Sequence, residues 1–357
     1  MLFLLALLAC RRDKDEEGPR DTWGDTNTAW ETDWTLPACE ASGSGAVTWT
    51  ADQGESSAER DGELDATAQT WSVVTLATPG SMAASHGGAL LRSSDAGCTW
   101  TQSAFPDGAN RELLAAGDLL YAWSPEEETI YRVEGTTFTE LASPDPDLVG
   151  MGVDPDDPLH VRAGNASCDL YASTDGGESW TLHQAAPSRS LNTTSVAFDP
   201  EDPDHVVCTL TDDGAFATFN GGERWERARG FQTEGPVKMY SALITPGDRQ
   251  VVWAEGLRVD DTTRIVWRSE DGGVTWTLGV EASDEIVLGS NVPLAVHPGA
   301  PNVVAIGGGA RLYLYDARTD TVTAADPATG VELQAIAASP AARGVWYLGV
   351  GYEDLGP

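Results

Sequence analysis

The sequence predicts an all-β protein: a seven-bladed β-propeller of four-stranded antiparallel blades, with the last blade closed by an N-terminal strand. Three observations lead to this fold class. A turn motif ending in tryptophan recurs along the chain, and its period of 40 to 50 residues is typical of propeller blades. The 38 glycines and 20 prolines separate many short apolar runs. No stretch shows sustained helical periodicity.

The recurring motif is an octapeptide of the form Ser-x-Asp-x-Gly-x-x-Trp. It occurs at residues 93–100, 173–180 and 269–276, and residues 218–225 form a variant with Thr and Asn replacing Ser and Asp. Asp-Gly or Asn-Gly indicates a tight hairpin with positive φ, in which the Asp or Asn side chain bonds nearby amides. The tryptophan then lies on the departing strand and covers apolar space. We assign structural roles to Asp95, Trp100, Asp175, Trp180, Asn220, Trp225, Asp271 and Trp276.

Three weaker copies extend the repeat to seven units. Each retains the turn pattern and places an apolar residue at or near the tryptophan position. With them, the intervals between successive anchors run from 38 to 51 residues. The weaker copies are residues 42–49, 132–139 and 316–322, anchored by Trp49, Phe138 and Val322.

A second repeated element consists of a strand, a proline-rich turn and another strand. It occurs at residues 153–161, 198–206 and 296–303. His160 and His205 occupy matching places in the first two copies, so they could be ligands for a bound group. Because they recur with the repeat, we interpret them as turn residues.

The two ends of the chain predict how the ring closes. After Val322, strands are expected near Leu333–Ala338 and Val345–Val350, which is short of a full blade. A strand around Trp49 precedes the first complete blade and can supply what is missing. Closure of this kind removes exposed sheet edges. The predicted propeller therefore spans residues 42–357.

Residues from about 42 to 352 resemble the BNR/Asp-box propellers on the strength of these octapeptides. That group includes sialidases, xyloglucan hydrolases, sortilin-type receptors and photosystem assembly factors. The resemblance implies the propeller fold, and it implies that the boxes lie on the face opposite the ligand site. It says little about activity, because one fold serves many functions.

The N-terminus predicts export and a lipid anchor. Leu2–Ala9 is an apolar run of eight residues, whereas a transmembrane helix needs about 20. Leu7-Leu8-Ala9-Cys10 resembles the bacterial lipobox, so we predict a lipoprotein signal peptide over residues 1–10 and acylation at Cys10. The alternative is a truncated ordinary signal peptide with a chance cysteine, since no Lys or Arg precedes the run. Residues 11–41 are acidic, poor in aliphatic residues and expected to form a disordered linker.

The cysteines predict two disulfides in an exported protein. Apart from Cys10, the chain contains Cys39, Cys98, Cys168 and Cys208. Four cysteines allow three pairings. Proximity within the repeat favours Cys39–Cys98 and Cys168–Cys208. A zinc site is the alternative, but the close CxxC spacing of such sites is missing.

The charge excludes one class of partner. The formal net charge is -35, which repels phosphate backbones, so we expect no nucleic-acid binding and no membrane contact beyond the anchor. We expect a monomer at the cell envelope, lipid-anchored at the outer membrane or cell surface, or secreted, without metal or cofactor. Its expected ligand is a protein or polysaccharide.

The sequence favours a binding or scaffold protein over an enzyme. A sialidase-like exo-glycosidase is the alternative, but the Arg-Ile-Pro motif of sialidases is missing. Other glycosidases use a pair of carboxylates, and among 56 acidic residues no pair stands out. Thus we predict no catalytic residue.

Two longer loops, residues 227–240 and 256–264, concentrate basic and aromatic side chains in an acidic protein. Such side chains are common anchors in interfaces. The alternative is that the arginines pair with local acids and the aromatic rings cap the core. The candidate ligand-binding residues are Arg229, Phe231, Lys238, Tyr240 and Arg258.

Overall fold

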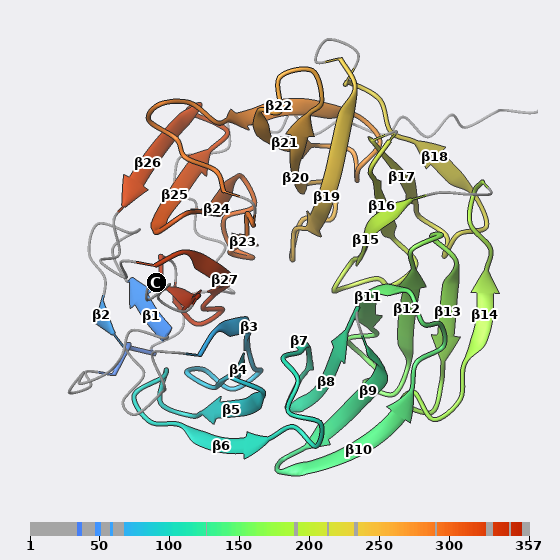
Figure 1. Ribbon diagram of the computed structural model, residues 1–357, viewed down its shortest axis with the longest axis vertical. Coiled ribbons are helices and arrows are strands. Elements are labelled where there is room, and N and C mark those ends of the chain that lie inside the picture. Colours follow the sequence, from blue (N-terminus) through green and yellow to red (C-terminus); the bar gives the residue numbers. More distant parts are fainter. Residues whose placement is uncertain are drawn as a thin grey trace, which may run out of the picture.

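The computed structural model describes residues 34–37, 47–50, 58–59, 68–125, 127–188, 192–212, 214–231, 235–289, 291–325, 331–342 and 344–351. Its strands form four-stranded antiparallel sheets arranged radially in a ring (Figure 1). The prediction of an all-β propeller with four-stranded antiparallel blades is therefore confirmed. Within the described ranges, no helix is long and apolar enough to cross a membrane. The predicted signal peptide and Cys10 lie outside these ranges.

Six blades are each built from four strands that are consecutive in sequence, with the first strand innermost and the fourth outermost. One comprises β3 (Thr70–Thr75), β4 (Met82–His86), β5 (Ala89–Ser93) and β6 (Thr101–Ala104). The next comprises β7 (Glu112–Ala116), β8 (Leu119–Ser124), β9 (Glu127–Glu134) and β10 (Thr137–Ala142). The third comprises β11 (Leu148–Val153), β12 (Val161–Asn165), β13 (Leu170–Ser173) and β14 (Thr181–Gln184).

The remaining consecutive blades continue around the ring in the same way. One comprises β15 (Thr193–Phe198), β16 (Val206–Leu210), β17 (Gly214–Thr218) and β18 (Trp225–Arg227). The next comprises β19 (Val237–Ile244), β20 (Val252–Arg258), β21 (Arg264–Ser269) and β22 (Trp276–Glu281). The last of the six comprises β23 (Leu294–Val296), β24 (Val303–Gly308), β25 (Arg311–Asp316) and β26 (Thr321–Ala325).

A further four-stranded sheet joins the two ends of the described chain. Its inner strands are β27 (Leu333–Ala338) and β28 (Trp346–Val350), and its outer strands are β1 (Val47–Thr50) and β2 (Ala58–Glu59). Strand β1 pairs antiparallel with β28 over its whole length. The predicted closure by N-terminal sequence is confirmed, although two strands contribute to it instead of one.

The closing blade corrects the alignment of residues 42–49 with the octapeptide. That alignment requires Trp49 to lie on the fourth strand of its blade. Trp49 lies instead on β1, which pairs with β28 on one edge and β2 on the other and so is the third strand. The match failed because the Gly-Ser-rich residues 42–45 resemble a degenerate turn in sequence alone.

The hydrophobic core lies between neighbouring blades. Every residue of the second strands β4, β12, β16, β24 and β28 is buried, because these strands have sheet neighbours on both edges and other blades on both faces. The fourth strands β6 and β14 are largely exposed. One apolar cluster, for example, combines Val207 and Ala217 of one blade with Trp267 and Trp276 of the next.

Toward the axis the blades converge, and glycine permits the approach. A Cβ atom on Gly150 of β11 would lie 2.0 Å from the carbonyl oxygen of Val196 on β15. Only a residue without a side chain fits there. The innermost strands therefore contact each other almost backbone to backbone on this side of the ring.

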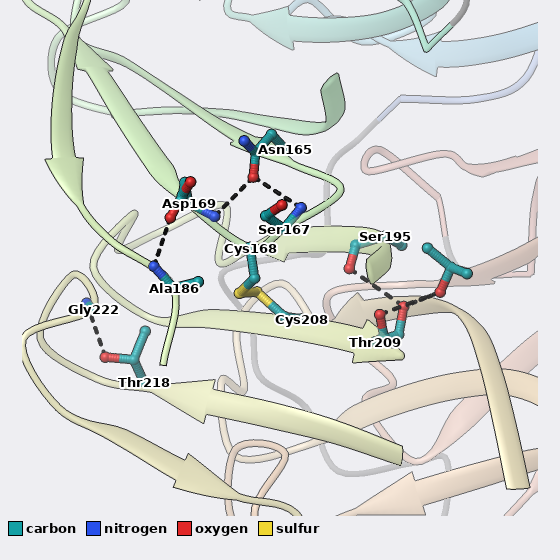
Figure 2. The surroundings of a disulfide bond; sticks show 11 residues. Asn165, Ser167, Cys168, Asp169, Ala186, Ser195, Cys208, Thr209, Thr218 and Gly222 are labelled. Carbon is teal, nitrogen blue, oxygen red and sulfur yellow. Dashed lines mark hydrogen bonds between the residues drawn. A yellow bond between two sulfur atoms is a disulfide. The ribbon is translucent and has the colours of Figure 1, made fainter. Parts of the chain in front are cut away.

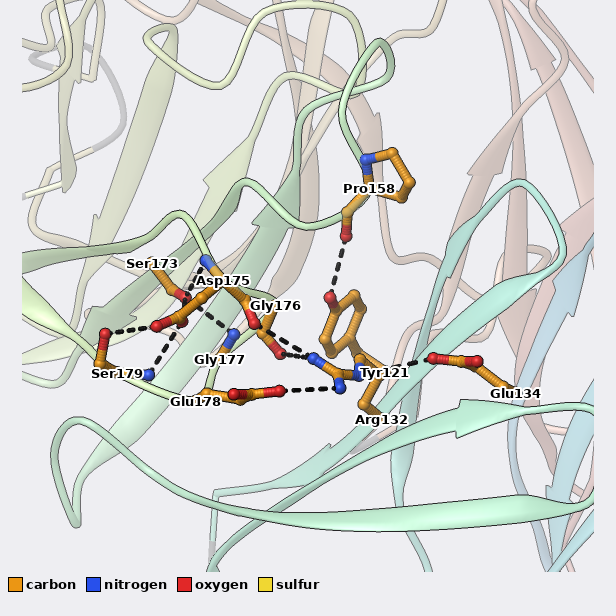
Figure 3. A network of polar contacts seen from close by, with 10 residues as sticks. All are labelled: Tyr121, Arg132, Glu134, Pro158, Ser173, Asp175, Gly176, Gly177, Glu178 and Ser179. Carbon is orange, nitrogen blue, oxygen red and sulfur yellow. Dashed lines mark hydrogen bonds and ion pairs between the residues drawn. The ribbon is translucent and has the colours of Figure 1, made fainter.

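The four octapeptides form the turns between third and fourth strands, and we call them the box turns. In the one shown in Figure 3, the Ser173 hydroxyl donates to Asp175 Oδ1 at 2.7 Å, and the Gly177 amide donates to the Ser173 Oγ at 2.8 Å. The Ser179 amide donates to Asp175 Oδ1 at 2.9 Å. Hydrogen bonds from the Ser179 hydroxyl, the Ser179 amide and the Ser173 hydroxyl lower the pKa of Asp175 to about 2. Asp95, Asn220 and Asp271 make the same bonds in their turns.

The tryptophans that end the box turns differ in burial. Trp276 is 2% exposed, and its indole N–H donates to the Gly273 carbonyl at 2.8 Å. Trp100, Trp180 and Trp225 are only partly buried. The motif therefore fixes the same turn in each blade, while the burial of its tryptophan depends on the neighbouring blade.

A side chain of the preceding blade also contacts the box turn of residues 173–180. Arg132 of β9 donates to the carbonyls of Asp175 and Gly176 at 3.1 and 3.2 Å and pairs with Glu178 at 3.1 Å (Figure 3). These contacts join two blades through one turn.

His160 and His205 lie in the turns between first and second strands, as predicted. The His205 ring contacts Asp199 through Nδ1 at 3.0 Å and the Gly272 carbonyl of the next blade through Nε2 at 2.9 Å. His160 contacts Asp154 at 3.3 Å. Both histidines therefore hold turns, and His205 also connects two blades.

The disulfide Cys168–Cys208 joins two neighbouring blades and confirms that predicted pairing (Figure 2). Cys168 lies in the turn after β12 with φ of 66°, and the Asn165 side chain shapes this turn by accepting amide hydrogen bonds from Ser167 and Asp169 at 3.0 and 2.9 Å. Cys98 is also disulfide-bonded. Its predicted partner, Cys39, lies outside the described residues.

Residues 34–37 differ from the expected disordered linker. Trp34 and Leu36 are partly buried and pack against the cluster that joins the closing blade to the β3–β6 blade. Two large apolar side chains provide enough burial to order this short stretch. The rest of residues 11–41 lies outside the described ranges.

Candidate functional site

A central cavity opens where the innermost strands begin. Because successive strands are antiparallel, the box turns and the proline-rich turns lie together on one face, and the starts of the first strands lie on the other. The cavity has a volume of about 750 Å³ and is lined by residues of β3, β7, β19, β20, β21, β23 and β27. An adjoining cavity of about 450 Å³ shares Glu112 and Tyr240 with it. Concave sites of this size are the usual place for ligands.

Five of the innermost strands carry a β-bulge near their start. In each case one residue has no partner in the second strand, as in β3, where Thr70 pairs with His86 and Ser72 with Ser85. A bulge bends the strand and redirects the extra side chain. All five extra residues line one of the two central cavities. We call them the bulge ring: Trp71, Val149, Thr194, Tyr240 and Gln334.

One wall of the cavity holds an acid, an arginine and an aromatic ring. Glu255 of β20 is 6% exposed and pairs with Arg264 of β21 at 3.2 Å. The guanidinium carbon of Arg264 lies 4.9 Å from the centre of the Tyr240 ring. Burial raises the pKa of Glu255 to about 7, and the charge of Arg264 opposes that rise only in part. The carboxyl group therefore gains and loses its proton near neutral pH.

Another acid stands across the ring, at the start of β7. Burial raises the pKa of Glu112 to about 7, while hydrogen bonding from the Trp71 and Ser72 side chains opposes the rise. The Ser72 hydroxyl oxygen accepts the Leu113 amide at 3.2 Å, which ties β3 to β7. Trp71 remains 38% exposed. A carboxyl group and an accessible indole ring thus share this side of the cavity.

Side-chain amides supply the remaining polarity. Gln334 Oε1 accepts hydrogen bonds from Gln69 Nε2 at 3.0 Å and from Asn291 Nδ2 at 3.1 Å. Among the residues that the structure describes, no group of three or more His, Cys, Asp or Glu side chains could hold a metal ion. The arrangement can therefore offer carboxyl, amide and aromatic groups to a ligand.

The structure separates the five residues predicted to bind ligand. Tyr240 lines the central cavity, whereas Arg229 and Phe231 line a different cavity of about 530 Å³. Phe231 is 8% exposed and packs against Trp267 and Trp276, with ring centres 5.9 and 6.3 Å away.

The other two predicted residues lie on β19 and β20. Arg258 pairs with Asp261 and Glu281, both at 2.9 Å. Lys238 of β19 is partly buried. For Phe231 and Arg258 the structure shows the alternative considered from sequence: a ring in the core and an arginine paired with local acids.

Sequence reasoning missed Trp71, Glu112, Glu255 and Gln334. A signal for the bulge ring does exist, since each member is followed by a small residue: Ser72, Gly150, Ser195, Ser241 and Ala335. The two glutamates carried no comparable pattern, because their raised pKa values come from burial by other blades.

Comparison with known proteins gives one close sequence match. The chain is 40% identical over 336 residues to the dispase autolysis-inducing protein of Streptomyces mobaraensis, an alignment covering 89% of this chain and 90% of that protein. No protein-family model matches the chain.

Solved structures support the fold at low identity. The GH74 xyloglucanase from Xanthomonas campestris superposes with a TM-score of 0.58 at 15% identity, covering 81% of this chain. The chain spans about half of that enzyme, 53% of its length. YCF48 bound to D1 peptide gives a TM-score of 0.56 at 14% identity, covering 88% of this chain and 99% of that one. These likenesses show a β-propeller.

Proposed function

The chain belongs to the family of the dispase autolysis-inducing protein, and from this premise we propose that it binds a protein partner and promotes that partner's self-digestion. The observation that carries the proposal is the 40% identity extending over 89% of the chain. An alignment of that extent includes the central cavity as well as the box turns. The site supports binding, because its carboxyl, amide and aromatic groups can dock a polar protein surface.

The test is direct. The full chain is mixed with dispase at equal molar amounts, and intact dispase is followed by gel electrophoresis together with its residual peptidase activity. We expect both to fall faster than in dispase alone, whereas the heat-denatured chain has no effect. Unchanged decay of dispase at several ratios would remove the proposal.

The proposed setting is the cell envelope. We propose that residues 1–10 are a lipoprotein signal peptide, that Cys10 is acylated, and that the protein is a monomer held clear of the membrane by residues 11–33. The inter-blade disulfide supports an oxidising compartment. Labelling with a palmitate analogue should mark the wild type and leave Cys10→Ala unlabelled and in the soluble fraction. Equal labelling of both would contradict the anchor.

A glycosidase is the second candidate, and one observation favours it. Glu112 and Glu255 line one cavity and both have a pKa raised to about 7, a property that a general acid needs. A panel of chromogenic glycosides at pH 5 to 8 tests it. Turnover that is lost in Glu112→Gln or Glu255→Gln would support catalysis. Glycan binding without turnover would indicate a polysaccharide-binding module.

A further inference from the structure

Opposite sides of the central cavity carry the same pair of groups. Each side has a glutamate whose pKa is raised by burial, and each has an aromatic ring turned inward by a bulge. Figure 1 places β3 and β7 across the ring from β19 and β20. The two sides differ in the groups that contact the glutamate and the aromatic ring.

On the β19–β21 side, an arginine completes the arrangement. Arg264 pairs with Glu255 at 3.2 Å and lies 4.9 Å over the Tyr240 ring. A guanidinium suits this position because its planar fork donates to the carboxylate while its face stacks on the ring.

On the β3–β7 side, the acid and the ring have neutral neighbours. The groups that hydrogen-bond Glu112 are the Trp71 indole and the Ser72 hydroxyl. Among the described residues, no arginine or lysine is ion-paired with Glu112. Glu112 is partly buried, and a carboxylate drawn out of water without a cation is unfavourable in its ionised form, so a cation that pairs with it stabilises that form.

We propose that this side of the cavity receives an arginine side chain from the partner protein, whose guanidinium pairs with Glu112 and stacks on Trp71. The inference rests on the proposed function and names the contact that the partner makes. The net charge of -35 favours approach of a cationic loop. The amide side chain of Asn291 lines the same cavity, and its oxygen can accept a further guanidinium N–H group.

Arginine fits this site better than lysine. Lysine presents a point charge with strong hydration, whereas the guanidinium can lose water from both faces and still satisfy its donors in the ring plane. The exposed indole of Trp71, at 38%, offers the best of the aromatic faces for a cation.

The first test uses Nα-acetyl-L-arginine amide as probe and Nα-acetyl-L-citrulline amide as its neutral counterpart, titrated into the full chain by calorimetry. We expect the arginine probe to bind and the citrulline probe to bind at least about tenfold more weakly. Glu112→Gln and Trp71→Leu should each weaken the arginine probe by about tenfold or more. Glu285→Gln removes the same charge from an exposed loop outside the cavity and should bind as the wild type does.

Equal binding of the two probes, or undiminished binding by Glu112→Gln, would overturn the inference. The dispase assay with the same variants separates this result from the fate of the proposed function. If the wild type induces autolysis of dispase and Glu112→Gln does so equally well, the proposed arginine contact is wrong, while the proposed function remains supported. A wild type without any effect on dispase would remove the function, while the probe titration still decides the chemistry of the cavity.

Discussion

The two faces of the propeller are built on different principles. On the box face, four turns repeat the same hydrogen bonds: the acid or amide of the motif accepts the amide of the fourth residue after it at 2.7 to 2.9 Å in every copy. On the cavity face, only a feature of the backbone repeats: five of the innermost strands have a β-bulge in their first half. The side chains presented there range from valine to tryptophan.

This difference teaches where specificity is located in a repeat protein. Turn chemistry is selected by local backbone geometry, so the four blades that have a box turn use the same types of residue in it. A bulge also fixes geometry, but it leaves the redirected side chain free to vary. The cavity can therefore present Trp71, Tyr240 and Gln334 without any change in the scaffold that carries them.

Among the substitutions that test this contrast between the two faces, we expect the largest loss of stability at Trp276, the most buried of the tryptophans that end the box turns. Trp276 is 2% exposed and lies between Phe231 and the Gly273 turn. Trp276→Ala should lower the free energy of unfolding by about 3 to 5 kcal/mol, because it opens a cavity in the core. Urea denaturation followed by circular dichroism measures it. A loss below about 1 kcal/mol would mean that box tryptophans do not stabilise the ring.

The disulfide between blades should come next. Cys168 and Cys208 are both fully buried and connect two sheets. Replacing both with alanine should reduce the free energy of unfolding by about 2 to 4 kcal/mol through the greater freedom of the unfolded chain. The same urea titration, with wild type under reducing conditions as a second comparison, checks it. Unaltered stability would show that neighbouring blades are held by packing alone.

The sequence was sufficient for what repeats and insufficient for what depends on three-dimensional neighbours. The box turns, the turn histidines and Cys168–Cys208 followed from spacing, because local hydrogen bonds and repeat proximity determine them. The packing of Phe231 against Trp267 and Trp276 was not predicted, because its position in a loop does not show which residues surround it in the fold. Glu112 was indistinguishable from other acids, since its raised pKa arises from burial in the folded protein, which the linear sequence does not show.

A third prediction concerns Glu112 and the pH dependence of stability. Its pKa is raised from an ordinary 4.5 to about 7 in the folded protein, so between those values the folded state binds more proton than the unfolded state. Stability therefore falls as pH rises through this window and stays lower above it. Glu112→Gln removes this loss, so its free energy of unfolding relative to that of the wild type should be about 3 kcal/mol higher at pH 8 than at pH 4.

Parallel urea titrations at the two pH values measure this gain. The control variant Glu285→Gln lies on an exposed loop. Its free energy of unfolding should differ from that of the wild type by the same amount at both pH values. If the difference in unfolding free energy between Glu112→Gln and the wild type did not change with pH, the ionisation of Glu112 would not be coupled to folding. Glu112 would then behave like an ordinary carboxyl group on the protein surface.

The smallest effect is expected where the same residue type is removed from the cavity face. Trp71 is 38% exposed at the tip of a bulge, so Trp71→Ala should change the free energy of unfolding by less than about 1 kcal/mol, against the several expected for Trp276→Ala. The same variant should weaken partner binding, because it removes the accessible aromatic face that the proposed arginine stacks on. A large loss of stability would instead make the bulge ring part of the scaffold, and the contrast between the two faces would disappear.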